Sequence, residues 1–149
     1  MKFPKCVVVA VDLADDIEVV LSRLHKMDFI KDAEIHLVHV SLKIVYSYPI
    51  GFGALTYPIT DDRVVIEQTV VKEISDLKDR ILPVGHTGRI VVECLFGEKP
   101  AETFCNYAKE KNADLMIVVP RKKKGIFDSS FAKYVINHSD INVMLLKDH

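Results

Sequence analysis

Short apolar runs rich in β-branched residues recur along the chain, and stretches with helical periodicity separate them. Each run is short and nearly continuous in apolar character, which is typical of strands buried on both faces of a sheet. Because connections that contain a helix join strands in parallel, we expect one parallel sheet. The expected strands are residues 6–12, 34–41, 89–96, 114–119 and 142–147.

The stretches between these runs carry helix signals. The second helix is expected to end before Pro83, because proline breaks the helical hydrogen-bond pattern. Pro100 follows Gly97 and lies in the first turn of a third helix, a favoured place for proline. Residues 129–138 make a short fourth helix. The apolar stripes of the first two helices are Ile17, Val20, Leu21, Leu24 and Met27, and Ile66, Val70, Ile74, Leu77 and Ile81.

This alternation predicts an α/β protein with a single five-stranded parallel sheet and helices on both faces, in one domain spanning residues 1–149. We expect the strand order 3-2-1-4-5 from the fold type. That order reverses between strands 1 and 4, and open sheets bind ligands beyond the carboxyl ends of the strands at such a point. Residues 12–16 and the segment VVPRKKKGIFDSS, residues 118–130, would flank the site.

Composition limits the classes of partner. The 149 residues are 49% hydrophobic and 28% charged with a formal net charge of −1, so no overall field favours nucleic acid or membranes. No apolar stretch approaches the roughly 18 residues of a membrane helix. Cys6, Cys94 and Cys105 show no zinc spacing, and we expect reduced, mostly buried thiols in a cytoplasmic protein. His36 and His39 would point to opposite faces of a strand and cannot chelate one metal.

The segment 118–130 has two interpretations. In the first it holds an anion: residues 121–124 supply four cations, and Ser129 and Ser130 stand at the start of a helix, where the dipole favours negative charge. However, Pro120 lacks an N–H where the turn begins, and Gly125 is the only glycine before the helix. The segment therefore offers few main-chain N–H groups with which to hold a phosphate.

In the second interpretation the segment is a solvated basic loop, with Asp128 capping the helix. Binding of nucleic acid is disfavoured, because only Phe127 accompanies the cations for stacking on bases. Catalysis is disfavoured as well. Ser130 and His138 lie too far apart along one helix to form a nucleophile–base pair. The acids near Asp12 have no second cluster with which to form a two-metal site. We therefore expect no enzyme.

Several segments together carry a family resemblance. VVVAVD and IHLVHV stand at the first two strands, GEKPAETFCNYAKEKNADLMIVV covers residues 97–119, and SSFAKYVINHSDINVMLLK covers 129–147. In this order and spacing they resemble the universal stress protein family over nearly the whole chain. The resemblance implies a Rossmann-like sheet of the adenine nucleotide alpha-hydrolase-like type, with the order given above. It also implies a stress-response protein that is usually a homodimer.

In that family, nucleotide-binding members carry G-x-x-G followed by G-S or G-T, which wraps the phosphates of ATP. Here Pro120 stands for the first glycine, and Ser129 replaces the glycine before Ser130. The chain is more similar to the A-type members, which lack the glycine motif. We therefore expect a non-catalytic, dimeric, cytoplasmic stress-response protein without a cofactor, acting through protein contacts. The alternative is a sensor of ATP or AMP, with or without Mg²⁺ and slow hydrolysis, that uses Asp12, Val40, Arg121, Ser129 and Ser130.

Two further segments are candidate contact surfaces. Residues 42–60 are rich in Tyr, Phe, Pro and Gly, and segments of this length are often functional. We interpret them as a hydrophobic flap over the site or against an unidentified protein partner; the alternative is a loop that packs on its own sheet. Strand 142–147 would be an apolar edge, which is an aggregation hazard unless paired. We expect a two-fold homodimer that joins two such strands.

Overall fold

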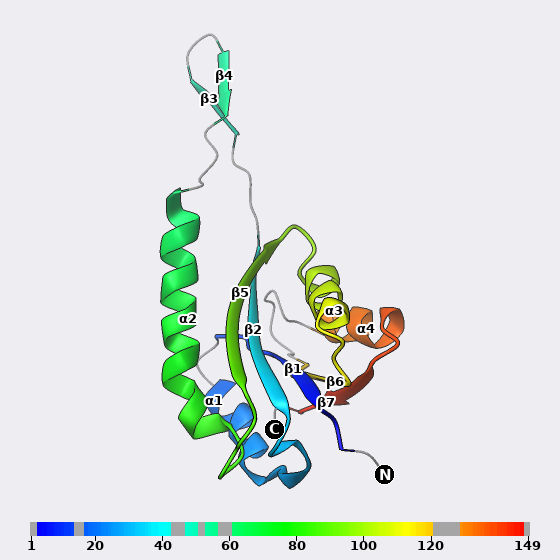
Figure 1. Cartoon of the computed structure of the whole chain (residues 1–149). Helices are drawn as coiled ribbons and strands as arrows, with labels where there is room; N and C mark the ends of the chain where they lie inside the picture. Colours follow the sequence, from blue (N-terminus) through cyan, green and yellow to red (C-terminus); the bar gives the residue numbers. More distant parts are fainter. Residues whose placement is uncertain are drawn as a thin grey trace.

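A parallel sheet of five strands forms the centre of the molecule (Figure 1), with the order β5-β2-β1-β6-β7. The computed structural model describes residues 3–13, 17–42, 47–50, 53–56, 61–120 and 129–147. Counted in chain order within this sheet, the strands run 3-2-1-4-5, which confirms the predicted fold and strand order. The strands are β1 (Cys6–Ala10), β2 (Glu34–Leu42), β5 (Ile90–Gly97), β6 (Leu115–Val118) and β7 (Asn142–Leu145).

Helices cover both faces of the sheet (Figure 1). One face carries α1 (Ile17–Leu21) and α2 (Asp61–Ile81), and the other carries α3 (Pro100–Glu110) and α4 (Ser129–His138). Successive side chains of a strand point to opposite faces. Val7 and Val9 therefore join the apolar core under α1 and α2, while Val8 joins the core under α3 and α4. All five residues of the central strand β1 are buried, which explains its continuous apolar run.

The first helical segment differs from the prediction. The periodic stripe predicts one helix through Met27, but α1 ends at Leu21 and two 3₁₀ helices follow, Ser22–Lys26 and Asp28–Ile30. The hydroxyl of Ser22 donates to the carbonyl of Val19 (2.7 Å), a side-chain bond that competes with regular helical pairing. The apolar residues of the stripe through Leu24 are nevertheless buried, so the pattern identified the core face correctly.

The second helix begins earlier than its apolar stripe suggests. Val70, Ile74 and Ile81 are buried as predicted, but Ile66 is exposed, as are Val64 and Val65. Figure 1 shows the first turns of α2 extending beyond the sheet toward the β3–β4 hairpin. Ile66 therefore lies outside the core, although Arg63 in the same part of α2 lies over the ring of Phe96 on β5, 4.5 Å from its centroid. Within the described residues, no helix is long and apolar enough to cross a membrane.

Part of the segment 42–60 forms a β-hairpin. Strands β3 (Ser47–Ile50) and β4 (Gly53–Thr56) are antiparallel and make a separate two-stranded sheet. In Figure 1 this hairpin lies beyond the end of β2, away from the five-stranded sheet. The sequence predicted a long irregular segment here, so its backbone is more regular than expected. Leu42 is the last residue of β2, and residues 43–46, 51–52 and 57–60 of the segment lie outside the described ranges.

Candidate functional site

The strand order reverses at β1, which lies between β2 and β6. β1 is followed by α1 on one face of the sheet, and β6 is followed by α4 on the other face (Figure 1). Open α/β sheets bind ligands where such a reversal separates the carboxyl ends of two strands. The candidate site therefore lies beyond the ends of β1 and β6, as the sequence predicted.

The end of β1 is held against β2 by two hydrogen bonds. The N–H of Val11 donates to the carbonyl of Val38 (2.8 Å), and Nδ1 of His39 lies 2.8 Å from the carbonyl oxygen of Val11. A carbonyl oxygen only accepts, so Nδ1 of His39 carries the proton. β2 and β5 continue beside each other as far as the pair Leu42 and Gly97. The chain thus leaves the sheet after Val11, while β2 and β5 continue further as a pair.

The predicted binding residues lie in different environments. Asp12 is half-buried and lies two residues after Ala10, the last residue of β1, while Ser130 is exposed in the first turn of α4. Val40 is 0% exposed and belongs to the core under α3 and α4. A ligand would reach its side chain only if neighbouring core residues moved. Ser129 is the first residue of α4, and Arg121 lies outside the described residues, with the rest of the basic segment 121–128.

The described residues offer little catalytic chemistry at this end of the sheet. Across the described ranges, no group of three or more His, Cys, Asp or Glu side chains is placed to hold a metal ion. Ser130 and His138 stand at opposite ends of α4. The Nδ1–H of His138 donates to the Tyr134 carbonyl (3.0 Å), and its ring stacks on that of Tyr134 with centroids 3.9 Å apart. His138 is therefore engaged at its own end of the helix.

The thiols are free, as predicted. Cys6 and Cys94 are buried, and Cys105 is partly exposed. Burial raises the pKa of all three thiols, that of Cys105 to about 11. A thiol with a raised pKa is protonated near neutral pH and is a poor nucleophile. The prediction of mostly buried thiols agrees with the burial of Cys6 and Cys94.

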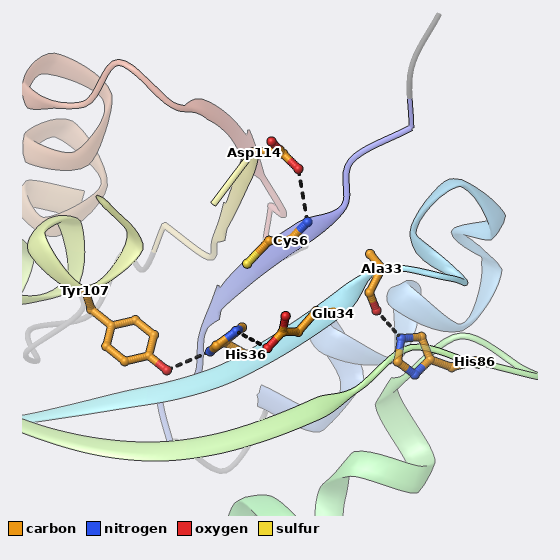
Figure 2. Close-up of polar contacts among 7 residues, drawn as sticks. All are labelled: Cys6, Ala33, Glu34, His36, His86, Tyr107 and Asp114. Atoms are coloured by element: carbon orange, nitrogen blue, oxygen red, sulfur yellow. Dashed lines mark hydrogen bonds and ion pairs between the residues drawn. The ribbon is translucent and has the colours of Figure 1, made fainter. Parts of the chain in front are cut away.

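A buried polar cluster was missed by the sequence analysis. His36 on β2 lies between Tyr107 of α3 and Glu34 of its own strand (Figure 2). Figure 2 also shows Asp114, whose carboxylate accepts the backbone N–H of Cys6 (3.1 Å), near the start of β1. The cluster lies toward the amino ends of the strands, opposite to the candidate ligand site. The only sequence signal was a histidine within an apolar strand, and its partner is 71 positions away.

Residues 5–147 match the Universal stress protein family. The chain belongs to the universal stress protein family. The match covers all five strands of the main sheet, so the resemblance expected from the sequence is confirmed. Comparison with curated proteins gives no match.

Solved structures of universal stress proteins share this fold. The chain is similar to universal stress protein UspA from Lactobacillus plantarum, with a TM-score of 0.71 and 17% identity, over 98% of this chain and 99% of that one. It is similar to the Archaeoglobus fulgidus universal stress protein in complex with dAMP, with a TM-score of 0.59 and 20% identity, over 99% of this chain and 100% of that one. It is also similar to a universal stress protein in complex with cAMP, with a TM-score of 0.64 and 16% identity, over 96% of this chain and 97% of that one. At these identities the likeness establishes the fold.

Proposed function

We propose that this universal stress protein is a non-catalytic, cytoplasmic homodimer that acts through protein contacts. The observation that carries the proposal is the hairpin β3–β4, whose strands pair with each other and not with the main sheet. A two-stranded hairpin alone is only marginally stable in water, so contact with another protein would stabilise it. Residues 44–60 contain no charged side chain and include three tyrosines and a phenylalanine, residue types that are enriched at interfaces.

Support for the dimer comes from the free edge of β7. Leu146 donates its N–H to the carbonyl of Val118 (2.9 Å). Because alternate residues of a strand bond to opposite sides, Val143 and Leu145 direct their backbone groups away from β6, toward the edge. Leu145 is 38% exposed there. A two-fold axis beside β7 would pair two such edges and remove the hazard of an apolar edge strand.

The variant Leu145→Pro tests the dimer. Proline removes a backbone N–H from the outer edge of β7 and none of the hydrogen bonds to β6, and edge strands tolerate it. We expect wild type and the control Leu145→Ala to be dimers at micromolar concentration in size exclusion with light scattering, and Leu145→Pro to be a folded monomer. A monomeric wild type, or a Leu145→Pro variant that remains a dimer, would contradict the edge-strand dimer.

A variant without the hairpin tests the proposed contact surface. Replacing residues 47–56 by a short Gly-Ser loop should leave a folded dimer, because β3 and β4 take no part in the main sheet. Affinity capture from a lysate of the source cells would then compare this chain with the full chain. We expect some proteins to be captured by the full chain and not by the chain that lacks the hairpin. Identical sets of captured proteins would argue against the hairpin as a contact surface.

Nucleotide sensing is the second candidate. It is favoured by the position of Asp12 and of the start of α4 at the strand-order reversal, and by the complexes with cAMP and dAMP among similar structures. Ser130 and the helix dipole would face a phosphate, and Asp12 a ribose. A thermal-shift titration with ATP and AMP tests this candidate, because ligand at 100 times Kd stabilises a protein by about 2.7 kcal/mol. No shift with either nucleotide would exclude it.

A further inference from the structure

His36 is the one buried polar side chain among the described residues, at 3% exposure. It projects from β2 toward α3 (Figure 2), on the face of the sheet whose core is formed by apolar side chains under α3 and α4. Nδ1 lies 2.7 Å from the hydroxyl oxygen of Tyr107, and Nε2 lies 3.2 Å from Oε1 of Glu34. The ring therefore links the sheet to α3 through both of its nitrogens.

The chemistry of the two partners fixes the tautomer. An ionised carboxylate only accepts hydrogen bonds, so Nε2 of His36 carries the proton and donates to Glu34. Nδ1 then has a lone pair, and the hydroxyl of Tyr107 donates to it. Burial raises the pKa of the Tyr107 phenol, so this donor keeps its proton. Neutral His36 satisfies both partners.

Protonation would break this arrangement. In the imidazolium both nitrogens are donors, so Nδ1–H would face the O–H of Tyr107. The hydroxyl would have to turn and lose its acceptor inside an apolar core. A charge would also be placed where burial penalises it. Only Glu34, across the ring, would gain from the new charge.

Charged side chains on several neighbouring elements influence the pKa of His36. Burial lowers the pKa of His36 below its ordinary value of 6.5, and Glu34 opposes this by favouring the charged form. Lys111 at the end of α3 and Arg89 before β5 lower the pKa further. Glu93 of β5 and Glu34 act on Tyr107, and Glu34, Asp114 before β6 and Lys111 act on Cys6.

We propose that His36 is a pH-sensitive latch between β2 and α3, closed when the ring is neutral and opened when it is protonated. The effect would extend to α4. Phe104 lies one turn before Tyr107 on α3, and its ring packs on that of Phe131, with centroids 5.6 Å apart. Phe131 lies in the first turn of α4, next to Ser130. Loosening of α3 would therefore shift the start of α4, whatever ligand or partner the protein binds.

The direction of the pH effect follows from the lowered pKa. Between the folded pKa and 6.5, the unfolded chain binds more protons at His36 than the folded chain does. The stability that neutral His36 contributes is thus fully present above pH 6.5 and is lost as the pH falls through that window. Acidification is expected to loosen α3, and return to neutral pH to restore it.

Two near-isosteric variants test the latch in opposite directions. Ring ¹⁵N NMR of the full chain, recorded against pH, reports the tautomer and the titration midpoint of His36. In wild type we expect the Nε2–H tautomer and a midpoint below that of free histidine. Tyr107→Phe removes the donor that stabilises the neutral ring and should raise the midpoint. Glu34→Gln removes the carboxylate that favours the charged ring and should lower it.

The resonances of Phe131 report the coupling to α4. They should titrate with the midpoint of His36 in wild type and follow it in both variants. A buried histidine with a purely structural role would show no titration that Phe131 follows. The latch is wrong if His36 carries its proton on Nδ1 at neutral pH, if the two variants move the midpoint in the same direction, or if Phe131 is insensitive to pH. Urea denaturation at neutral pH verifies that each variant is folded.

Discussion

Phe104→Ala is expected to lower the free energy of unfolding by about 3–5 kcal/mol. Phe104 is 0% exposed and lies in the core between the sheet and α3. Truncation would remove its ring from the contact with Phe131 and leave a cavity in the core that joins α3 to α4. Domains of this kind are stable by about 5–15 kcal/mol, so the variant would lose a large share of its stability.

Urea denaturation at pH 7.5 or above measures this effect, because His36 is neutral there. Phe3→Ala is the matched control: the same ring is removed, but Phe3 is 66% exposed. A change within about 0.5 kcal/mol is expected for the control. Equal denaturation midpoints for the two variants would contradict the placement of Phe104 in the core.

Gly88→Ala is the second large effect, expected to cost about 3 kcal/mol, at the upper end of the range for overpacking. A Cβ on Gly88 would lie 2.0 Å from the carbonyl oxygen of Ala33 and 2.6 Å from its carbon. These are backbone atoms and cannot turn away. The same turn is tied down by Nε2 of His86, which lies 2.7 Å from that carbonyl oxygen, as Figure 2 shows. The clash would therefore separate the start of β5 from the start of β2.

A control substitution in the same turn shows whether the loss of stability is specific to the clash at Gly88. Val84→Ala changes a side chain that is 78% exposed, and we expect a change within about 0.5 kcal/mol. Both variants are compared with wild type by urea denaturation. If Gly88→Ala were as stable as Val84→Ala, β5 would not approach Ala33 as closely as described.

The strands were predictable because burial on both faces leaves a strong signal. β1 has the sequence CVVVA and is buried at every position. Its continuous apolar run, its short length and its β-branched residues all indicate a buried strand. The expected bounds differ from the observed ones by one or two residues, since strand ends depend on hydrogen bonds that composition does not show. The order of strands came from the fold type and the family resemblance, because a strand's neighbours are set by tertiary packing.

The hairpin β3–β4 was missed although a local signal was present. Two short runs separated by Gly51 and Phe52 fit the Gly-X pattern of a two-residue hairpin connection. Pro49 and the glycines weakened that signal, because they are rare inside strands. The link between His36 and Tyr107 had no local signal at all. It arises only because β2 and α3 pack together, and a local sequence pattern cannot reveal a contact between residues 71 positions apart.

The candidate ligand site was predictable in position but not in detail. Its place follows from the strand order, and Asp12 lies at the end of β1 as expected. The burial of Val40 follows from its place in an apolar strand, but the assignment of Val40 to the ligand site came from the family resemblance and overlooked that burial. The basic segment at 121–124 lies outside the described residues, so its assignment to an anion site or to a solvated loop stays a prediction.

Release of bound nucleotide tests the central proposal, a function in protein contacts, most directly. The freshly purified chain is denatured and filtered, and the filtrate is examined for adenine by its ultraviolet spectrum and by chromatography against ATP and AMP. A filtrate without adenine nucleotide is predicted, because Pro120 lacks an N–H and Gly125 is the only glycine between it and Ser129, which leaves few main-chain amides to hold phosphates. Adenine nucleotide released in a stoichiometric amount would contradict that prediction and establish the sensor instead.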